Sequence, residues 1–183
     1  MPSSIESFAP RLMGLIKNKK VLFLSHAHPD LDTLASAHVL QQSLSSYCLQ
    51  AVFGIPEKPL MHFQIQLEHY QLNPQIISTL EGFDLVVCVD FRSPSQAGEL
   101  EYALNKFFKQ VIIFDHHSPS TSEFQSPLET CIIPAQIACA QMVMELLSIS
   151  KNEISPENAS LLAAAIVSDS ARFANANSET FRV

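Results

Sequence analysis

Glycine is scarce in this sequence, which contains only four glycines in 183 residues. Glycine-rich loops that hold phosphates need several glycines at fixed spacing. Neither the GxGxxG pattern of dinucleotide-binding loops nor the GxxxxGK pattern of Walker loops occurs in the chain. Nucleotide sites of these two kinds are therefore not expected.

Basic residues are scarce as well. Eleven Lys and Arg stand against 18 Asp and Glu, which gives a formal net charge of −7. Proteins that hold long duplex DNA do so largely through basic contacts with its phosphates. A broad basic face for duplex DNA is therefore not expected, and nucleic acid would have to be handled at a local site.

The sequence also lacks cysteine pairs and long apolar segments. Its four cysteines show no CxxC spacing, so buried thiols are favoured over zinc ligands or disulfides. No segment approaches the roughly 18 apolar residues that span a bilayer, and the N-terminus lacks the apolar core of a signal peptide. With 47% apolar and 16% charged residues, the composition predicts a compact globular protein, cytoplasmic and without membrane contact.

Apolar runs of strand length alternate with segments of helical periodicity. Buried strands are predicted at residues 21–24, 50–53, 84–90, 111–115 and, more weakly, 130–133. Helices are predicted within residues 1–19 and at about 33–46, 60–70, 94–108, 135–148 and 156–168. This alternation predicts βαβ units, and hence an α/β domain in which helices cover both faces of a largely parallel sheet.

Three of the predicted strands lead directly into acidic or imidazole side chains. The first continues into HAHPDLD at residues 26–32, the run LVVCV continues into Asp90, and VIIF continues into DHH at residues 115–117. The carboxyl ends of parallel strands lie along one edge of a sheet, where ligands bind. We therefore expect these ends to converge in one crevice. The converging residues are His26, Asp30, Asp32, Asp90, His116 and His117, with Asp169 joining from the end of the last helix.

Carboxylates gathered in one crevice cannot all remain ionised without cations. One divalent ion would leave excess negative charge, whereas two ions that share a bridging carboxylate would balance it. Two metals about 3.5–4 Å apart activate a water and stabilise an in-line phosphoryl displacement. Ligands rich in oxygen, with some imidazole and no thiolate, suit Mn²⁺, with Mg²⁺, Fe²⁺ or Co²⁺ as alternatives. The pattern thus predicts a site for two divalent metal ions.

Each part of the pattern also has a simpler explanation. Asp90 alone could cap a helix or occupy a turn, and Asp30 and Asp32 could favour a helix N-terminus. Metal binding is the better explanation because it accounts for all of these residues at once. Arg92 and Arg172 each follow a predicted ligand closely, so each could meet a phosphate, although a purely solubilising role is equally open for both.

The ordered motifs resemble the DHH phosphoesterase superfamily, which includes RecJ-like exonucleases, nanoRNases, cyclic dinucleotide or pAp phosphodiesterases and manganese family II inorganic pyrophosphatases. The resemblance covers about residues 20–183 and rests on four motifs: His26-x-x-x-Asp30-x-Asp32, Asp90 after an apolar strand, Asp115-His116-His117, and Asp169 near a helix end. It implies a Rossmann-like three-layer domain with a mainly parallel sheet of about five strands flanked by helices.

The resemblance also implies a role for each motif residue. One metal ion would be held by His26 and Asp30, and Asp90 would bridge it to the second. The ligands of the second ion would be Asp32, His116 and Asp169. Asp115 would orient its neighbours, and His117 would lie beside the scissile phosphate while a metal-activated hydroxide attacks phosphorus.

Two motifs depart from the common pattern of that superfamily. His28 stands where many members have Asn, and it would order the loop or add a ligand. With Arg92 and Arg172, His28 completes the predicted substrate-binding residues. The fourth motif reads Asp169-Ser170-Ala171 in place of Asp-Thr-Gly. Neither departure removes a predicted metal ligand.

The implied activity is metal-dependent hydrolysis of phosphodiester or phosphomonoester bonds in small nucleotides or short single-stranded oligonucleotides. A manganese-dependent inorganic pyrophosphatase and a non-catalytic DHH-like binding module or scaffold are the alternatives, and a homodimer is left open. The Gly-rich motif of the DHH-associated substrate domain does not occur within residues 1–183. This chain is therefore expected to be the catalytic domain, as a fragment of a longer protein or as a one-domain relative.

Overall fold

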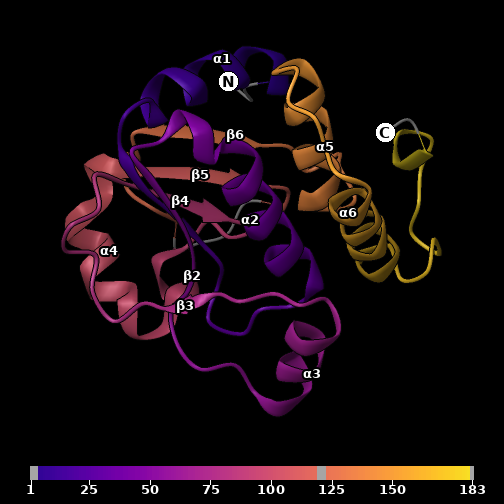
Figure 1. Cartoon of the computed structure of the whole chain (residues 1–183), viewed down its shortest axis with the longest axis horizontal. Coiled ribbons are helices and arrows are strands. Elements are labelled where there is room, and N and C mark those ends of the chain that lie inside the picture. Colours follow the sequence, from indigo (N-terminus) through magenta and orange to yellow (C-terminus); the bar gives the residue numbers. More distant parts are fainter. Residues whose placement is uncertain (1–3, 119–122, 182–183) are drawn as a thin grey trace.

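The computed structural model describes residues 4–118 and 123–181. Within these residues, six strands form one parallel sheet (Figure 1), in the order β3-β2-β1-β4-β5-β6. The strands are β1 (Lys20–Leu24), β2 (Gln50–Ile55), β3 (Gln75–Ile76), β4 (Leu85–Val89), β5 (Val111–Asp115) and β6 (Glu129–Ile132). The predicted parallel α/β fold is confirmed.

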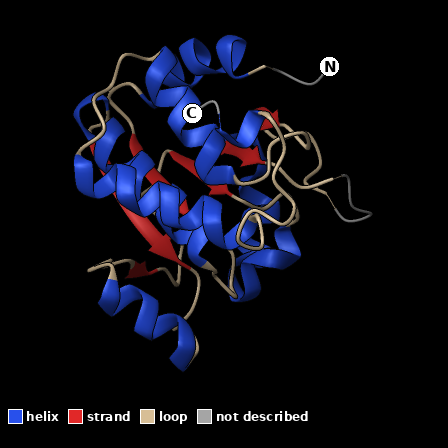
Figure 2. Cartoon of the chain, turned by 90° about the vertical axis from the view of Figure 1, so that its right-hand side faces the viewer, coloured by secondary structure: helices blue, strands red, loops and turns tan. Residues whose placement is uncertain are grey.

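Helices lie on both sides of the sheet, which gives three layers (Figures 1 and 2). The α-helices are α1 (Ile5–Ile16), α2 (Leu31–Leu44), α3 (Met61–His69), α4 (Glu101–Phe107), α5 (Cys139–Ile149) and α6 (Pro156–Asp169). The 3-10 turns are η1 (Ser45–Tyr47), η2 (Pro94–Leu100), η3 (Phe108–Gln110) and η4 (Glu179–Phe181). In the described part of the chain, none of the helices combines the length and the apolarity needed to cross a membrane.

The strands separate two hydrophobic cores. In β1, Val21 and Phe23 pack in the core formed with α1, α2, α5 and α6, whereas Leu22 and Leu24 pack in the core formed with η2 and α4. Successive strand residues point to opposite faces of a sheet. Both faces are covered here, and this explains why the central strands are continuously apolar rather than alternating.

The sequence missed one strand of the sheet. All five predicted strands are present, but β3 adds a sixth at the edge beside β2. β3 has only two residues, and both are exposed. It therefore carries neither the length nor the apolar run by which a strand is recognised.

Two predicted helices differ from the observed ones. The predicted helix at 94–108 is broken at Gly98, whose φ of 55° and ψ of −124° are not helical. A Cβ at Gly98 would lie 2.8 Å from Glu57 Oε1 and 3.0 Å from Ala27 Cβ, so this close approach requires glycine. The helix predicted at 135–148 begins only at Cys139, and residues 135–138 belong to the loop before it.

The other predicted helices agree with the structure to within a few residues. The helix predicted within residues 1–19 is α1, which begins after the N-cap Ser4; residues 1–3 lie outside the described part of the chain. The helix predicted at 156–168 is α6, and its N-cap Ser155 accepts a hydrogen bond from the backbone amide of Asn158. These starts were predictable because capping residues mark them.

Candidate metal centre

The candidate centre lies at the carboxyl edge of the sheet, where the neighbouring strands β1, β4 and β5 end. β1 leads through the loop carrying His26 to Asp30, which is the N-cap of α2. Asp30 Oδ1 accepts a hydrogen bond from the backbone amide of Thr33 at 3.1 Å. Thr33 Oγ1 donates to the carbonyl oxygen of Val89 at 2.8 Å. The start of α2 is thereby fixed to the end of β4.

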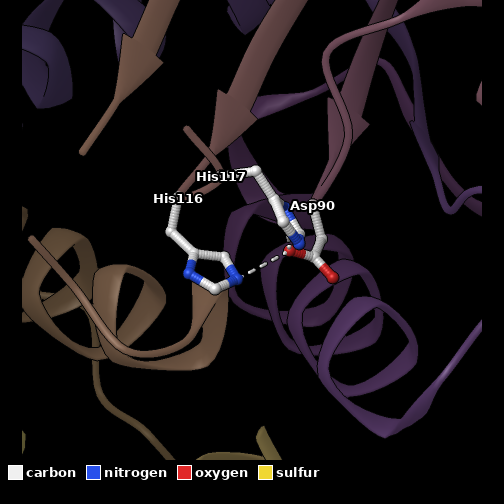
Figure 3. Close-up of side chains that lie close together, drawn as sticks. All are labelled: Asp90, His116 and His117. Carbon is white, nitrogen blue, oxygen red and sulfur yellow. Dashed lines mark ion pairs between the residues drawn. The ribbon is translucent and has the colours of Figure 1, made fainter. Parts of the chain in front are cut away.

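Asp90 follows β4 in a strained backbone conformation. Its φ of 67° lies in the left-handed region, which non-glycine residues rarely adopt. From the end of β5, the side chains of His116 and His117 point toward the Asp90 carboxylate (Figure 3). Asp90 Oδ1 lies 3.3 Å from His116 Nε2 and 3.6 Å from His117 Nδ1. The strained conformation thus places the carboxylate between the ends of two strands.

The side chains that were predicted as metal ligands form overlapping groups. Potential ligand atoms within 4.8 Å of one another are offered by His26, Asp30 and Asp90 in one group and by Asp32, His116 and Asp169 in another. A third group, formed by Asp90, His116 and His117, links these two. All six predicted ligands are therefore brought together, in the two groups that the resemblance to the DHH superfamily implied. Their binding of metal stays a prediction.

His116 has its two ring nitrogens in different surroundings. Nδ1 lies 3.2 Å from the carbonyl oxygen of Gln136. Because a carbonyl can only accept, Nδ1 is the protonated nitrogen. Nε2 faces three carboxylates and makes no hydrogen bond to any residue that the structure describes. Its distances are 3.7 Å to Asp32 Oδ2, 3.3 Å to Asp90 Oδ1 and 3.5 Å to Asp169 Oδ2. A lone pair that faces three carboxyl oxygens forms a set of oxygen and imidazole donors, so the residues fit a divalent cation.

Asp32 is buried and held by the backbone of a distant helix. Its Oδ2 accepts from the amide of Cys139 at 2.7 Å, and its Oδ1 accepts from the amide of Ala140 at 2.8 Å. These amides belong to the first turn of α5, where unpaired N–H groups and the helix dipole stabilise a negative charge. The carboxylate is therefore oriented before any ligand arrives.

Burial and mutual repulsion raise the pKa of several carboxyl groups at the centre. Burial raises the pKa of Asp32 to about 7. The pKa of Asp90 is raised well above its ordinary value by burial and then by the charges of Asp32 and Asp30. Burial also raises the pKa of Asp169, and it lowers the pKa of His26. Each shift disfavours the charged form, and a bound dication would reverse this for the carboxyl groups.

Asp115 and His117 form a separate hydrogen-bonded pair. Asp115 is fully buried, and its Oδ1 lies 2.8 Å from His117 Nδ1. This bond is the main cause that raises the pKa of His117. The side chain of His117 is 54% exposed, so its other ring nitrogen can reach a molecule in the crevice. The predicted orienting role of Asp115 agrees with this contact.

The three predicted substrate-binding residues lie in different surroundings. His28 and Arg172 are exposed, His28 in the loop after β1 and Arg172 in the turn after α6. Arg92 is buried, and its guanidinium is engaged by the loop after β5. Its Nη1 donates to the carbonyl oxygen of His117 at 3.1 Å, and its Nη2 lies 2.7 Å from Glu123 Oε1. Arg92 thus supports the segment that carries His117.

The turn after Asp169 is strained. Ala171, Arg172 and Phe173 have φ values of 51°, 57° and 68°, all in the left-handed region. The turn is closed by the amide of Arg172, which donates to the carbonyl oxygen of Val167 at 2.8 Å. Three such residues in succession are costly, and strain of this kind gathers at functional sites.

Sequence reasoning missed the residues that orient the ligands. The carbonyl of Gln136 and the amides of Cys139 and Ala140 contact two predicted ligands through backbone atoms. Contacts made through backbone atoms cannot be predicted from residue type. The one available signal was the start of α5, because a helix N-terminus can hold a carboxylate, and that start was predicted four residues too early.

The fold and the centre define a parallel α/β protein with a cluster of carboxylates and imidazoles at the carboxyl edge of its sheet. The family model described as the N-terminal domain of the DHH family matches residues 20–166. This chain belongs to the DHH family, as its motifs predicted.

Two relatives are manganese-dependent inorganic pyrophosphatases by name. The pyrophosphatase of Methanocaldococcus jannaschii is 28% identical over 158 residues, which cover 82% of this chain and 48% of that protein. A probable pyrophosphatase of Staphylococcus epidermidis is 29% identical over 164 residues, which cover 84% of this chain and 49% of that protein. The chain thus spans about half the length of these relatives.

Solved structures with the same fold include three proteins. An exopolyphosphatase-related protein from Bacteroides fragilis has a TM-score of 0.71 at 19% identity, over 95% of this chain and 54% of that one. A putative family II inorganic pyrophosphatase from Methanococcus jannaschii has a TM-score of 0.65 at 24% identity, over 88% of this chain and 53% of that one. The exonuclease RecJ bound to manganese has a TM-score of 0.51 at 20% identity, over 92% of this chain and 44% of that one. These likenesses support the α/β fold.

Proposed function

We propose that this chain is the catalytic domain of a manganese-dependent hydrolase that cleaves phosphoester or phosphoanhydride bonds. The observation that carries the proposal is the surroundings of His116 Nε2. This nitrogen lies 3.3–3.7 Å from three carboxylates, while Nδ1 of the same ring is held by a carbonyl. Such an arrangement is stable when a cation lies among these groups, and oxygen with imidazole suits Mn²⁺.

Two neighbouring sites for Mn²⁺ would share one carboxylate. His26 and Asp30 would hold the first ion, and Asp90 would contact both. Three residues would hold the second ion: Asp32, His116 and Asp169. Bound Mn²⁺ would supply Lewis acidity toward a phosphoryl oxygen and would lower the pKa of water at the centre.

His117 would supply the proton that the leaving group needs. Asp115 binds its Nδ1 and raises its pKa, so the imidazolium form persists to higher pH. In the hydrolysis, a water oxygen forms a bond to phosphorus while the bond from phosphorus to the leaving oxygen breaks. His117 Nε2 would give its proton to that leaving oxygen, and the proton lost by the water would restore His117 through solvent.

The exposed residues near the centre would contact the substrate. Arg172, presented by the strained turn after α6, would bind a phosphate oxygen, and His28 would contact the same molecule from the loop after β1. Small nucleotides and short single-stranded oligonucleotides are the first candidate substrates. The net charge of −7 supports a small substrate over long duplex DNA.

Inorganic pyrophosphate is the second candidate substrate. The observation that favours it is the naming of both curated relatives as manganese-dependent inorganic pyrophosphatases. A scaffold without catalysis has the least support, because every predicted ligand position carries a side chain that can bind metal.

The experiment is a hydrolysis assay of the purified chain with Mn²⁺, with Asp90→Asn as the control. Separate assays would use bis-p-nitrophenyl phosphate, a dinucleotide and pyrophosphate. We expect turnover that depends on Mn²⁺ and is lost in Asp90→Asn. Cleavage of the diesters without pyrophosphate turnover supports the first candidate, and the reverse supports the second. Absence of turnover on all three, with Mn²⁺ bound, contradicts the proposal.

A further inference from the structure

One peptide group beside the candidate centre is held from both ends. The carbonyl of Gln136 accepts from His116 Nδ1 at 3.2 Å. The amide of the same peptide group, that of Ile137, donates to the side-chain oxygen Oε1 of Gln141 at 3.4 Å. In a trans peptide the carbonyl and the amide point in opposite directions. Gln141 on one side therefore determines where the carbonyl on the other side points.

Gln141 is suited to this task because it is rigidly placed. It lies in the first turns of α5 and is only 2% exposed, surrounded by the core of the domain. One turn later on the same helix, Glu145 Oε2 accepts from the side-chain amide of Gln136 at 3.1 Å. The loop before α5 is thus held to that helix by side chains four residues apart, which lie on one helix face.

The same helix also orients a second predicted ligand. The amides of Cys139 and Ala140 hold the two oxygens of Asp32 at 2.7 Å and 2.8 Å. The ring of His116 and the carboxylate of Asp32 therefore take their orientation from adjoining parts of one segment. Gln141 follows Ala140 directly in the chain.

We infer that Gln141 is a positioning residue of the centre: it fixes the peptide group between Gln136 and Ile137, and through it the ring of His116. This inference rests on the proposed function, since it assumes that His116 binds metal through Nε2. A carbonyl on Nδ1 fixes the tautomer and leaves the Nε2 lone pair toward the carboxylates. Without Gln141, the peptide group can rotate and the ring loses its fixed partner.

The first test measures, by nitrogen-15 NMR in the metal-free protein, which ring nitrogens of His116 carry a proton. The His116→Gln variant assigns the signals. We expect the wild type to carry its proton on Nδ1. Gln141→Met removes the acceptor at similar volume and should give mixed tautomers. Gln141→Glu keeps an acceptor oxygen and should retain the wild-type pattern.

Gln41→Met is the matched control. Gln41 also uses its side chain to bind a backbone group, donating to the carbonyl oxygen of Ala51 at 3.2 Å, but it lies far along α2 from Asp32. The control should keep the wild-type tautomer. Circular dichroism would establish that each variant is folded. If Gln141→Met does not fold, Gln141→Glu still tests whether an acceptor oxygen at this position retains the wild-type tautomer.

The second test measures Mn²⁺ binding by calorimetry. Loss of an outer partner of a metal-binding histidine weakens affinity by about tenfold or more. We expect about a tenfold loss in Gln141→Met and wild-type affinity in Gln41→Met. If the wild type binds no Mn²⁺, the proposed function fails, and the tautomer measurement alone decides the role of Gln141.

Three results would overturn the role of Gln141. The first is a wild-type His116 ring whose Nδ1 carries no proton. The second is a Gln141→Met variant with the wild-type tautomer and wild-type Mn²⁺ affinity. The third is a loss of the wild-type tautomer and of Mn²⁺ affinity in Gln141→Glu that is as large as the loss in Gln141→Met.

Discussion

The carboxylate of Asp32 and the backbone amide of Cys139 are 107 residues apart in the chain, yet they form a hydrogen bond of 2.7 Å. The bond joins the start of α2 to the start of α5. Asp32 is buried, so its orientation is set by the fold and not by solvent. A predicted metal ligand is therefore held by a helix terminus, which offers partial positive charge without a basic side chain.

Removal of this amide should weaken metal binding. Proline is tolerated at the first helical position, and Ala138 before it is already extended, with φ −151° and ψ 150°. We expect Cys139→Pro to lower Mn²⁺ affinity by about tenfold, within the range for lost outer partners. Cys139→Ala removes the thiol but keeps the amide, and calorimetry should give it wild-type affinity. Equal affinities for Pro and Ala would show that the amide does not matter.

Replacement of Asp90 should separate metal binding from folding. Asp90 is buried, its Oδ1 has no hydrogen-bond partner within residues 4–118 and 123–181, and burial with the nearby charges raises its pKa. Asp90→Asn keeps the shape without the charge. We expect Mn²⁺ affinity to fall by more than about 100-fold, while the melting temperature of the metal-free protein does not fall, because burial already disfavours the charged form of Asp90.

The matched control for that change lies at the other end of the same strand. Asp84 Oδ2 accepts from the backbone amide of Lys20 at 2.8 Å, away from the centre. Asp84→Asn keeps an acceptor oxygen for the Lys20 amide, so it should keep wild-type Mn²⁺ affinity and nearly wild-type stability. An Asp90→Asn variant that binds Mn²⁺ as well as Asp84→Asn does would refute the bridging role.

The stability of the metal-free protein should fall as pH rises. Burial raises the pKa of Asp32 from 3.8 to about 7 in the folded state. The folded protein therefore holds a proton that the unfolded chain has already released, so stability is fully present below the unfolded pKa and is lost as pH rises through about 7. Thermal unfolding between about pH 5 and pH 8 would measure this.

Mn²⁺ should change that pH profile, because it competes with the proton for the same carboxylates. We expect the rise in melting temperature caused by Mn²⁺ to grow over the same pH interval. Asp32→Asn in the metal-free state should make the profile less steep, while Asp90 and Asp169, whose pKa values are also raised, keep part of it. A metal-free wild type that becomes more stable as the pH rises would contradict this account of Asp32.

Arg92 should matter through the loop that it holds. Its guanidinium binds the His117 carbonyl and Glu123 at once, which the ammonium of lysine cannot reproduce. Glu123 is 35% exposed. We therefore expect Arg92→Lys to lower the free energy of unfolding by about 1.5 kcal/mol, at the low end of the range for hydrogen bonds to charged groups. Urea unfolding measures the loss. The control is Arg11→Lys. The side chain of Arg11, which pairs with Glu129, is 45% exposed, so we expect a smaller loss of stability.

Much of the centre could be predicted because its acidic and imidazole side chains directly follow predicted strands. Continuous apolar runs locate β1, β4 and β5, and a parallel sheet brings the residues that follow them to one edge. Asp90 and His116 are 3.3 Å apart for this reason, although neither residue alone suggested a ligand. The family of the chain followed from the same residues.

The remainder depends on contacts that residue type does not reveal. The edge strand β3 is short and exposed. The break at Gly98 reflects a close approach to Ala27 and Glu57 from elsewhere in the chain. The carbonyl of Gln136 on His116 is a backbone contact in a loop that was expected to be helical. For Arg92 the sequence left a phosphate contact and a solubilising role equally open, and the fold shows its guanidinium bound to the loop after β5.

The most direct test of the central claim is the number of Mn²⁺ ions bound per chain, measured by calorimetry together with electron paramagnetic resonance. We predict two ions, magnetically coupled because they lie about 3.5–4 Å apart across one carboxylate. In Asp90→Asn the coupled signal should disappear. A wild-type chain that binds no Mn²⁺, or only one magnetically isolated ion, would contradict the two-metal centre.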